Sequence, residues 1–160
     1  MSRVDFYHLQ SQTLENVLPK LLEKAYETGK SVLVRVGNEE RVEFLNALLW
    51  TYNDQSFLPH GSKKDGNAEL QPIWLTSGTD NPNIASLLFF NPNMASLLFL
   101  VDGAAADNGE LEKFSRVFNI FDGNSPDALQ QARAFWKNLK SGGNECFYWQ
   151  QDANGRWKQA

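Results

Sequence analysis

The sequence has little of what disulfides and metal sites need. Its 160 residues contain one cysteine, Cys146, and two histidines, His8 and His60. A lone cysteine excludes a disulfide within the chain and a multi-cysteine zinc site, and it suits a reducing cytoplasm. Neither histidine has metal-ligand spacing with Cys146, so we expect no metal ion and interpret both as buried or loop residues.

Long apolar runs and an excess of basic residues are also absent. No stretch approaches the roughly 20 apolar residues of a membrane helix, and Val4 to Leu9 is typical of a strand rather than a signal peptide. The formal charge of −4 and the pI near 5.2 argue against a grip on the phosphate backbone, so contact with DNA is expected to be indirect. We expect a soluble, cytoplasmic protein with no membrane partner, folded as a single domain over residues 1–160.

One continuous apolar run, Leu97 to Val101, ends at the turn dipeptide Asp102-Gly103. Such a run predicts a strand buried on both faces of a parallel sheet, and here the central strand. This run overlaps the end of a tandem repeat, in which residues 91–100 nearly copy residues 81–90. Only one copy can fill one strand position, and the second leads directly into the turn. Residues 81–90 are therefore predicted to be an insertion that packs elsewhere.

Strand and helix patterns alternate along the rest of the chain. The expected strands are 4–9, 31–36, 72–76, 97–101 and 117–121, the expected helices are 14–25, 39–52, 110–116 and 126–140, and residues 146–151 and 156–158 form a hairpin. Pro19 lies in the first turn of its helix or bends that helix. Residues 61–70 are polar, contain glycine and are predicted to be a mobile loop.

This order of elements predicts an α/β fold. Two successive strand-helix units indicate a parallel sheet whose first two strands lie side by side. The expected architecture is a Rossmann-like, three-layer domain of about five mainly parallel strands with helices on both faces.

Nucleotide-binding signals are missing from this fold. The loop after the first strand, Gln10 to Thr13, has no glycine, so no cofactor is expected. Asp102 and Asp122 do follow strands, where open α/β sheets bind ligands. They are compatible with a small nucleotide-binding protein or enzyme, or with ordinary turn chemistry, since aspartate before glycine is common in turns.

The helix at 126–140 combines basic and aromatic residues. On a helical wheel Arg133, Lys137 and Lys140 lie within about 60° of one another, and Leu129 and Trp136 lie at the border with the apolar side. This pattern suits a ligand with a carboxylate, held by Arg133, and an apolar side chain, packed on Trp136. The alternative is a solvated basic face beside a core tryptophan.

A second group of aromatic residues follows the helix at 39–52. Trp50 stands at its end, and Phe57, Pro59 and His60 lie in the next loop. These side chains either cap the core or form an exposed patch for a partner protein.

One set of segments extends over nearly the whole chain: Val4 to Tyr7, Leu48-Leu49-Trp50 with Ser56 to Gly61, the Asn-Pro-Asn turn before Phe99 to Gly103, Ala132 to Lys137, and Tyr148 to Asp152 with Gly155-Arg156-Trp157. In the order and spacing of these segments, the sequence resembles the chi-subunit family of bacterial DNA polymerase III. The tandem copy departs from the family pattern, which has one Asn-Pro-Asn turn.

The resemblance implies a non-catalytic accessory subunit with a nucleotide-binding-like fold and no nucleotide. In that family, chi pairs with the psi subunit of the clamp loader and binds the acidic C-terminal tail of single-stranded-DNA-binding protein. Arg133 then corresponds to the tail-binding arginine and Trp136 to its aromatic neighbour, with Lys137 and Phe121 beside them. Leu129 stands where the family can have lysine. The resemblance assigns psi, or another clamp-loader component, to a surface formed by Trp50, Phe57, Pro59 and His60.

Overall fold

The computed structural model describes residues 3–53, 58–66, 72–78 and 96–160. The strands are β1 (Arg3–Leu9), β2 (Val32–Val36), β3 (Gly61–Ser62), β4 (Ile73–Thr76), β5 (Ser96–Val101), β6 (Phe114–Asp122), β7 (Glu145–Gln151) and β8 (Trp157–Gln159). The helices are α1 (Leu14–Glu27), α2 (Glu39–Thr51), α4 (Asn108–Leu111) and α5 (Pro126–Ser141). One eight-stranded sheet has the order β3-β4-β2-β5-β6-β1-β7-β8 and is parallel except for the β7–β8 hairpin. The predicted α/β class is confirmed.

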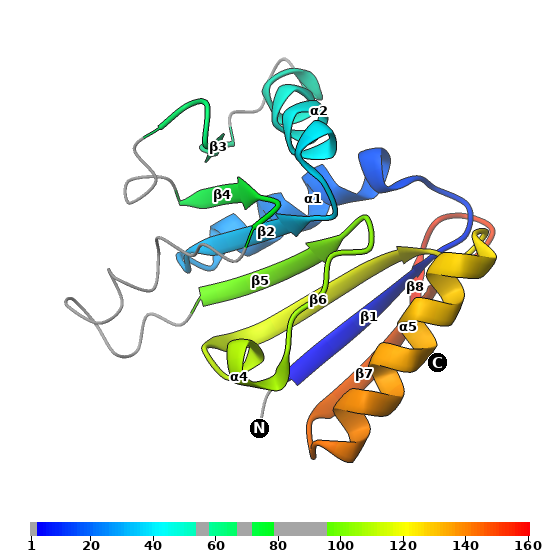
Figure 1. The fold of residues 1–160 in the computed structure, drawn as a ribbon. Helices are drawn as coiled ribbons and strands as arrows, with labels where there is room; N and C mark the ends of the chain where they lie inside the picture. Colours follow the sequence, from blue (N-terminus) through cyan, green and yellow to red (C-terminus); the bar gives the residue numbers. More distant parts are fainter. Residues whose placement is uncertain (1–2, 54–57, 67–71, 79–95) are drawn as a thin grey trace.

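Strand β5 lies between β2 and β6, in the middle of the sheet, as its apolar sequence predicted (Figure 1). Its side chains alternate between two cores. Leu97, Phe99 and Val101 pack in the core that α1 and α2 cover, and Leu98 and Leu100 pack in the core on the side of α4 and α5. Because both faces are covered, no residue from Leu97 to Val101 is more than 4% exposed.

The helix boundaries follow their capping residues. Asn38 accepts a hydrogen bond from the Arg41 backbone N–H at the start of α2, and Ser125 does the same for Ala128 at the start of α5. Helix α1 begins at Leu14, so Pro19 lies inside the helix and not in its first turn.

The first two strands, β1 and β2, are not neighbours, and that prediction was wrong. Strands β5 and β6 lie between them. Adjacent strands are about 4.8 Å apart, so the α1 crossover spans about 14 Å. The distance between β1 and β2 thus accommodates β5 and β6, whose apolar side chains are buried on both faces of the sheet.

Three further expectations need correction. The short helix expected at 110–116 ends at Leu111, and β6 begins at Phe114 because the Phe114 side chain is buried in the core. The loop expected at 61–70 begins with β3, which pairs with β4, and Asp65 accepts a hydrogen bond from the Ser62 backbone N–H. The sheet is also larger than expected, because β3 and the C-terminal hairpin extend it at both edges. Residues 67–70 and the first repeat copy, 81–90, lie outside the described residues.

Candidate functional site

A pocket of about 300 Å³ lies between α5 and the sheet. Three strands and one helix line it, through Phe6 of β1, Phe121 of β6, Tyr148 of β7, and Leu129, Ala132, Arg133 and Trp136 of α5. The strand residues share one face because β1 and β7 are parallel neighbours in which Phe6 is paired with Tyr148.

Aromatic rings form the walls of this pocket. The Trp136 ring meets Phe6 edge-on with 5.1 Å between centroids, and it meets Tyr148 with 6.1 Å between centroids. Phe121 is 6.3 Å from Tyr148. Aromatic side chains offer large apolar surfaces and pack in such edge-on and tilted arrangements. The pocket can therefore receive an apolar side chain.

Positive charge lies at the rim of the pocket. Arg133, Lys137 and Lys140 are exposed on α5, and the Lys140 ammonium stands 5.3 Å from the centre of the Trp136 ring. In the part of the chain that the structure describes, neither Arg133 nor Lys137 forms an ion pair with a carboxylate. The arginine can therefore bind an external anion without breaking a contact.

The structure thus gathers four of the five residues that were predicted to form the tail-binding site. Phe121, Leu129, Arg133 and Trp136 all line the pocket, and Lys137 does not. Sequence reasoning missed Phe6 and Tyr148 as lining residues. Their shared face depends on β1 and β7 being neighbours, which the periodicity of each strand alone does not reveal.

A buried histidine contacts two residues that line the pocket. His8 of β1 is 8% exposed, its Nδ1 atom forms a hydrogen bond with the Tyr148 hydroxyl, and its ring centre is 5.1 Å from that of Phe121. Burial lowers the pKa of His8, the positive charge of Arg133 lowers it further, and Asp122 opposes them. Burial also raises the pKa of Tyr148.

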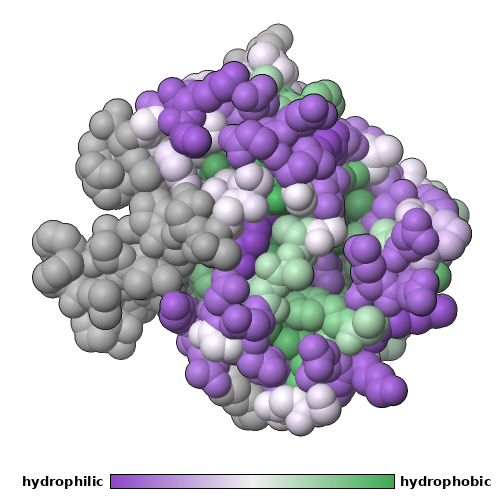
Figure 2. All heavy atoms as spheres, viewed as in Figure 1, coloured by the Kyte–Doolittle hydropathy of each residue, from purple (hydrophilic) through white to green (hydrophobic). Residues whose placement is uncertain are grey.

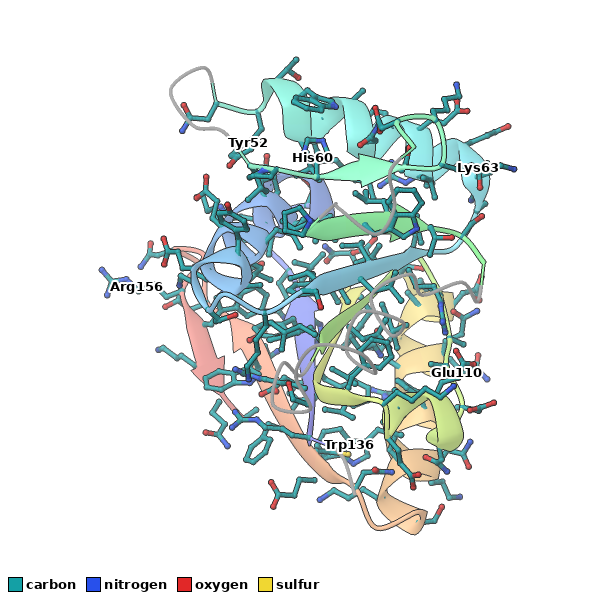
Figure 3. The ribbon with its side chains drawn as sticks, turned by 90° about the vertical axis from the view of Figure 1, so that its left-hand side faces the viewer. Tyr52, His60, Lys63, Glu110, Trp136 and Arg156 are labelled. Atoms are coloured by element: carbon teal, nitrogen blue, oxygen red, sulfur yellow. The ribbon has the colours of Figure 1, made fainter. Side chains whose placement is uncertain are left out.

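The second predicted surface lies at the other end of the molecule. Trp50 is 50% exposed, and its ring centre is 4.5 Å from that of His60. His60 is buried, with Nδ1 2.6 Å from the Leu58 carbonyl oxygen and Nε2 3.1 Å from that of Asn46. Pro59 is half-buried, and Phe57 lies outside the described residues. Figure 3 shows His60 and Trp136 at opposite ends of the structure, so these are two separate surfaces.

A larger cavity, of about 980 Å³, opens at the carboxyl ends of the parallel strands, where Asp102 and Asp122 both line it. Asp102 Oδ2 accepts a hydrogen bond from Arg41 Nε at 2.9 Å, and Asp122 Oδ1 accepts one from the Asn124 backbone N–H at 2.9 Å. Both carboxylates therefore stabilise loops. Glu15 also lines the cavity, where it pairs with Arg41. This excess of carboxylates disfavours a phosphate ligand.

Apolar side chains also gather between α4 and α5, where Figure 2 shows a green patch bordered by hydrophilic residues. Ala104, Ala106 and Phe135 pack against the core on the side of α4 and α5 and are only partly buried.

Among the described residues, no group of three or more histidine, cysteine, aspartate or glutamate side chains is placed to hold a metal ion. Within the described ranges, none of the helices has the length and apolar character needed to cross a membrane.

Comparisons with known proteins agree on one family. Residues 1–146 match the family described as "DNA polymerase III chi subunit, HolC". The chain is 35% identical over 88 residues to the probable DNA polymerase III subunit chi of Rickettsia prowazekii, across 55% of this chain and 53% of that protein. It is 32% identical over 92 residues to the DNA polymerase III subunit chi of Pseudomonas aeruginosa, across 55% of this chain and 63% of that protein. The chain thus covers between about half and two thirds of these relatives.

Proposed function

The chain belongs to the DNA polymerase III chi subunit family, and from this premise we propose that it is a non-catalytic replication subunit in the cytoplasm. Its role would be to link the clamp-loader complex to single-stranded-DNA-binding protein by holding the acidic C-terminal tail of that protein. Contact with DNA is then indirect, which agrees with the formal charge of −4.

The observation that carries this proposal is the aromatic pocket with Arg133 at its rim. A peptide tail that ends in an apolar residue offers a terminal carboxylate and an apolar side chain close together. The guanidinium can hold the carboxylate by charge-assisted hydrogen bonds while the side chain enters the pocket beside Trp136. One site then recognises both chemical features of the tail.

Charged side chains on either side of the pocket favour one orientation of the peptide tail along α5. Toward the C-terminus of α5, Lys137 and Lys140 are exposed, whereas Asp127 lies in the first turn of the helix and Asp122 ends β6, shortly before it. Acidic residues of the tail are attracted to the lysines and repelled by the aspartates. We therefore place the acidic part of the tail along the C-terminal half of α5.

The surface around Trp50 is proposed to bind the psi subunit or another clamp-loader component. The half-exposed indole of Trp50 on the buried His60 ring is a rigid apolar contact of the kind that anchors protein interfaces. Because this surface and the pocket lie at opposite ends of the structure, one molecule can hold both partners at once (Figure 3).

The direct test is a titration with a fluorescent peptide that copies the last residues of the host's single-stranded-DNA-binding protein. We expect saturable binding that weakens as salt is added, since the three basic side chains on α5 are exposed. The control peptide carries a C-terminal amide in place of the carboxylate and should bind more weakly. Absence of saturable binding, or equal binding of both peptides, would contradict the proposal.

Leu129→Lys should strengthen binding of the same peptide. Leu129 lies at the border of the pocket, one turn before Arg133, so a lysine there adds a positive charge near the terminal carboxylate that Arg133 would hold. An exposed charge pair predicts a gain of about threefold in affinity at low salt, and little gain at high salt. The control is Leu129→Gln, which removes the same apolar surface without adding charge. If the lysine variant binds no better than the glutamine variant, the terminal carboxylate of the tail does not lie beside this position.

A further inference from the structure

His8 is held in place on several sides without lining the pocket. Tyr148 and Phe121, which line the pocket, both contact it: its Nδ1 atom is hydrogen bonded to the Tyr148 hydroxyl, and its ring centre is 5.1 Å from that of Phe121. At Gly123 the backbone closes over the other ring nitrogen, because a Cβ atom there would lie 1.9 Å from His8 Nε2. The imidazole therefore contacts two of the residues that line the pocket.

Three ionisable or polar side chains act on this imidazole, each from a different element. Tyr148 of β7 forms its hydrogen bond, Asp122 of β6 favours its charged form, and Arg133 of α5 opposes that form. The opposing charge belongs to the residue at the pocket rim that would bind the tail. Whatever neutralises Arg133 therefore changes the balance at His8.

We propose that His8 positions Tyr148 in the wall of the pocket and couples binding of an anionic peptide tail at Arg133 to protonation of His8. The inference rests on the proposed function, since the tail is the ligand in both. A carboxylate on Arg133 cancels part of the positive charge that opposes the imidazolium, so tail binding raises the pKa of His8. Because the ligand touches Tyr148 and Phe121 rather than His8, it adds little further desolvation at the imidazole.

Thermodynamic linkage between tail binding and protonation of His8 gives the direction in which affinity changes with pH. If the bound tail favours protonated His8, protonated His8 favours the bound tail by the same factor. The free-state pKa of His8 lies below its ordinary value, so affinity rises as the pH falls below about 6.5. The hydrogen bond survives protonation, because a tyrosine hydroxyl can accept from an imidazolium as well as donate to a neutral ring.

The test measures tail-peptide affinity between about pH 7.5 and about pH 5.5, where the peptide carboxylates stay ionised. For the unmodified protein we expect an increase of about threefold, the size of a partly exposed charge pair. His8→Phe should remove this increase. His60→Gln changes the only other histidine and should retain it. An affinity that stays constant or falls in acid, or a His8→Phe variant with an unchanged pH profile, would overturn the inference.

A second measurement needs no variant. Calorimetric titrations near pH 6 in two buffers of different ionisation enthalpy should show that the unmodified protein takes up protons when the peptide binds. Binding without proton uptake would overturn the coupling and leave the proposed function standing. Failure to bind at every pH would instead contradict the proposed function itself.

Discussion

Arg133→Ala is expected to weaken binding of the tail peptide about tenfold or more and to leave the melting temperature unchanged. The side chain is exposed at the rim of the pocket, so its removal exposes no core. A hydrogen bond to a charged group contributes about 1.5 to 3 kcal/mol, and tenfold in affinity corresponds to about 1.4 kcal/mol. Anisotropy titrations at one low salt concentration, with thermal melts of both proteins, check this result.

The matched control is Arg156→Ala, which removes the same charge at another surface. Arg156 is exposed in the turn between β7 and β8, and Figure 3 shows it away from Trp136. Its loss should change affinity by less than about twofold, as expected for a remote, screened charge. Equal losses in the two variants would indicate attraction by net charge alone. Undiminished binding by Arg133→Ala would move the tail to another surface.

Two predictions about the sheet, the central position of β5 and the neighbours of β1, depend on different kinds of information in the sequence. The central position of β5 could be predicted because an apolar run bounded by a turn has few other places in an α/β protein. The neighbours of β1 could not be predicted, since the crossover through α1 can lead to an adjacent strand or, as here, pass over two strand positions. The choice depends on how all strands share two cores, which is a property of the whole chain.

The same division holds for the site. The basic stripe and the aromatic residue on α5 are visible from helical periodicity, so Arg133, Leu129 and Trp136 could be singled out before the structure. Phe6 and His8 come from β1, which is distant in sequence from α5, and Tyr148 comes from β7, which follows α5 directly. Their contribution to the pocket follows only from the parallel pairing of β1 with β7.

Asp5 provides the second large expected effect, since Asp5→Ala should destabilise the protein by about 3 kcal/mol. The carboxylate is fully buried in β1 and accepts hydrogen bonds from Arg3, Arg116 and the Trp149 indole, at 2.7 Å from Arg116 Nε and 2.9 Å from the indole nitrogen. Its removal leaves the indole N–H without its acceptor and two guanidinium groups without their shared anion. The arginine side chains are 42% and 34% exposed and regain water, which keeps the loss below that of a fully buried ion pair.

A fall in melting temperature of about 9 °C corresponds to that destabilisation in a chain of this size, and Glu43→Ala is the control. Glu43 is also paired, with Lys64 at 2.8 Å, but both side chains are largely exposed, so its removal should leave the melting temperature unchanged.

The dependence of stability on acid pH provides an independent check on the role of Asp5. Burial of Asp5 raises its pKa, but the hydrogen bonds from Arg116, Arg3 and Trp149 outweigh burial, and the folded-state pKa is below its ordinary value. The stabilisation is therefore complete above about pH 4 and is lost as the pH falls through that lowered pKa, because the protonated carboxyl no longer pairs with the arginines. The difference in unfolding free energy between the unmodified protein and Asp5→Ala should narrow over that range, and a constant difference would show that Asp5 acts by packing rather than by charge.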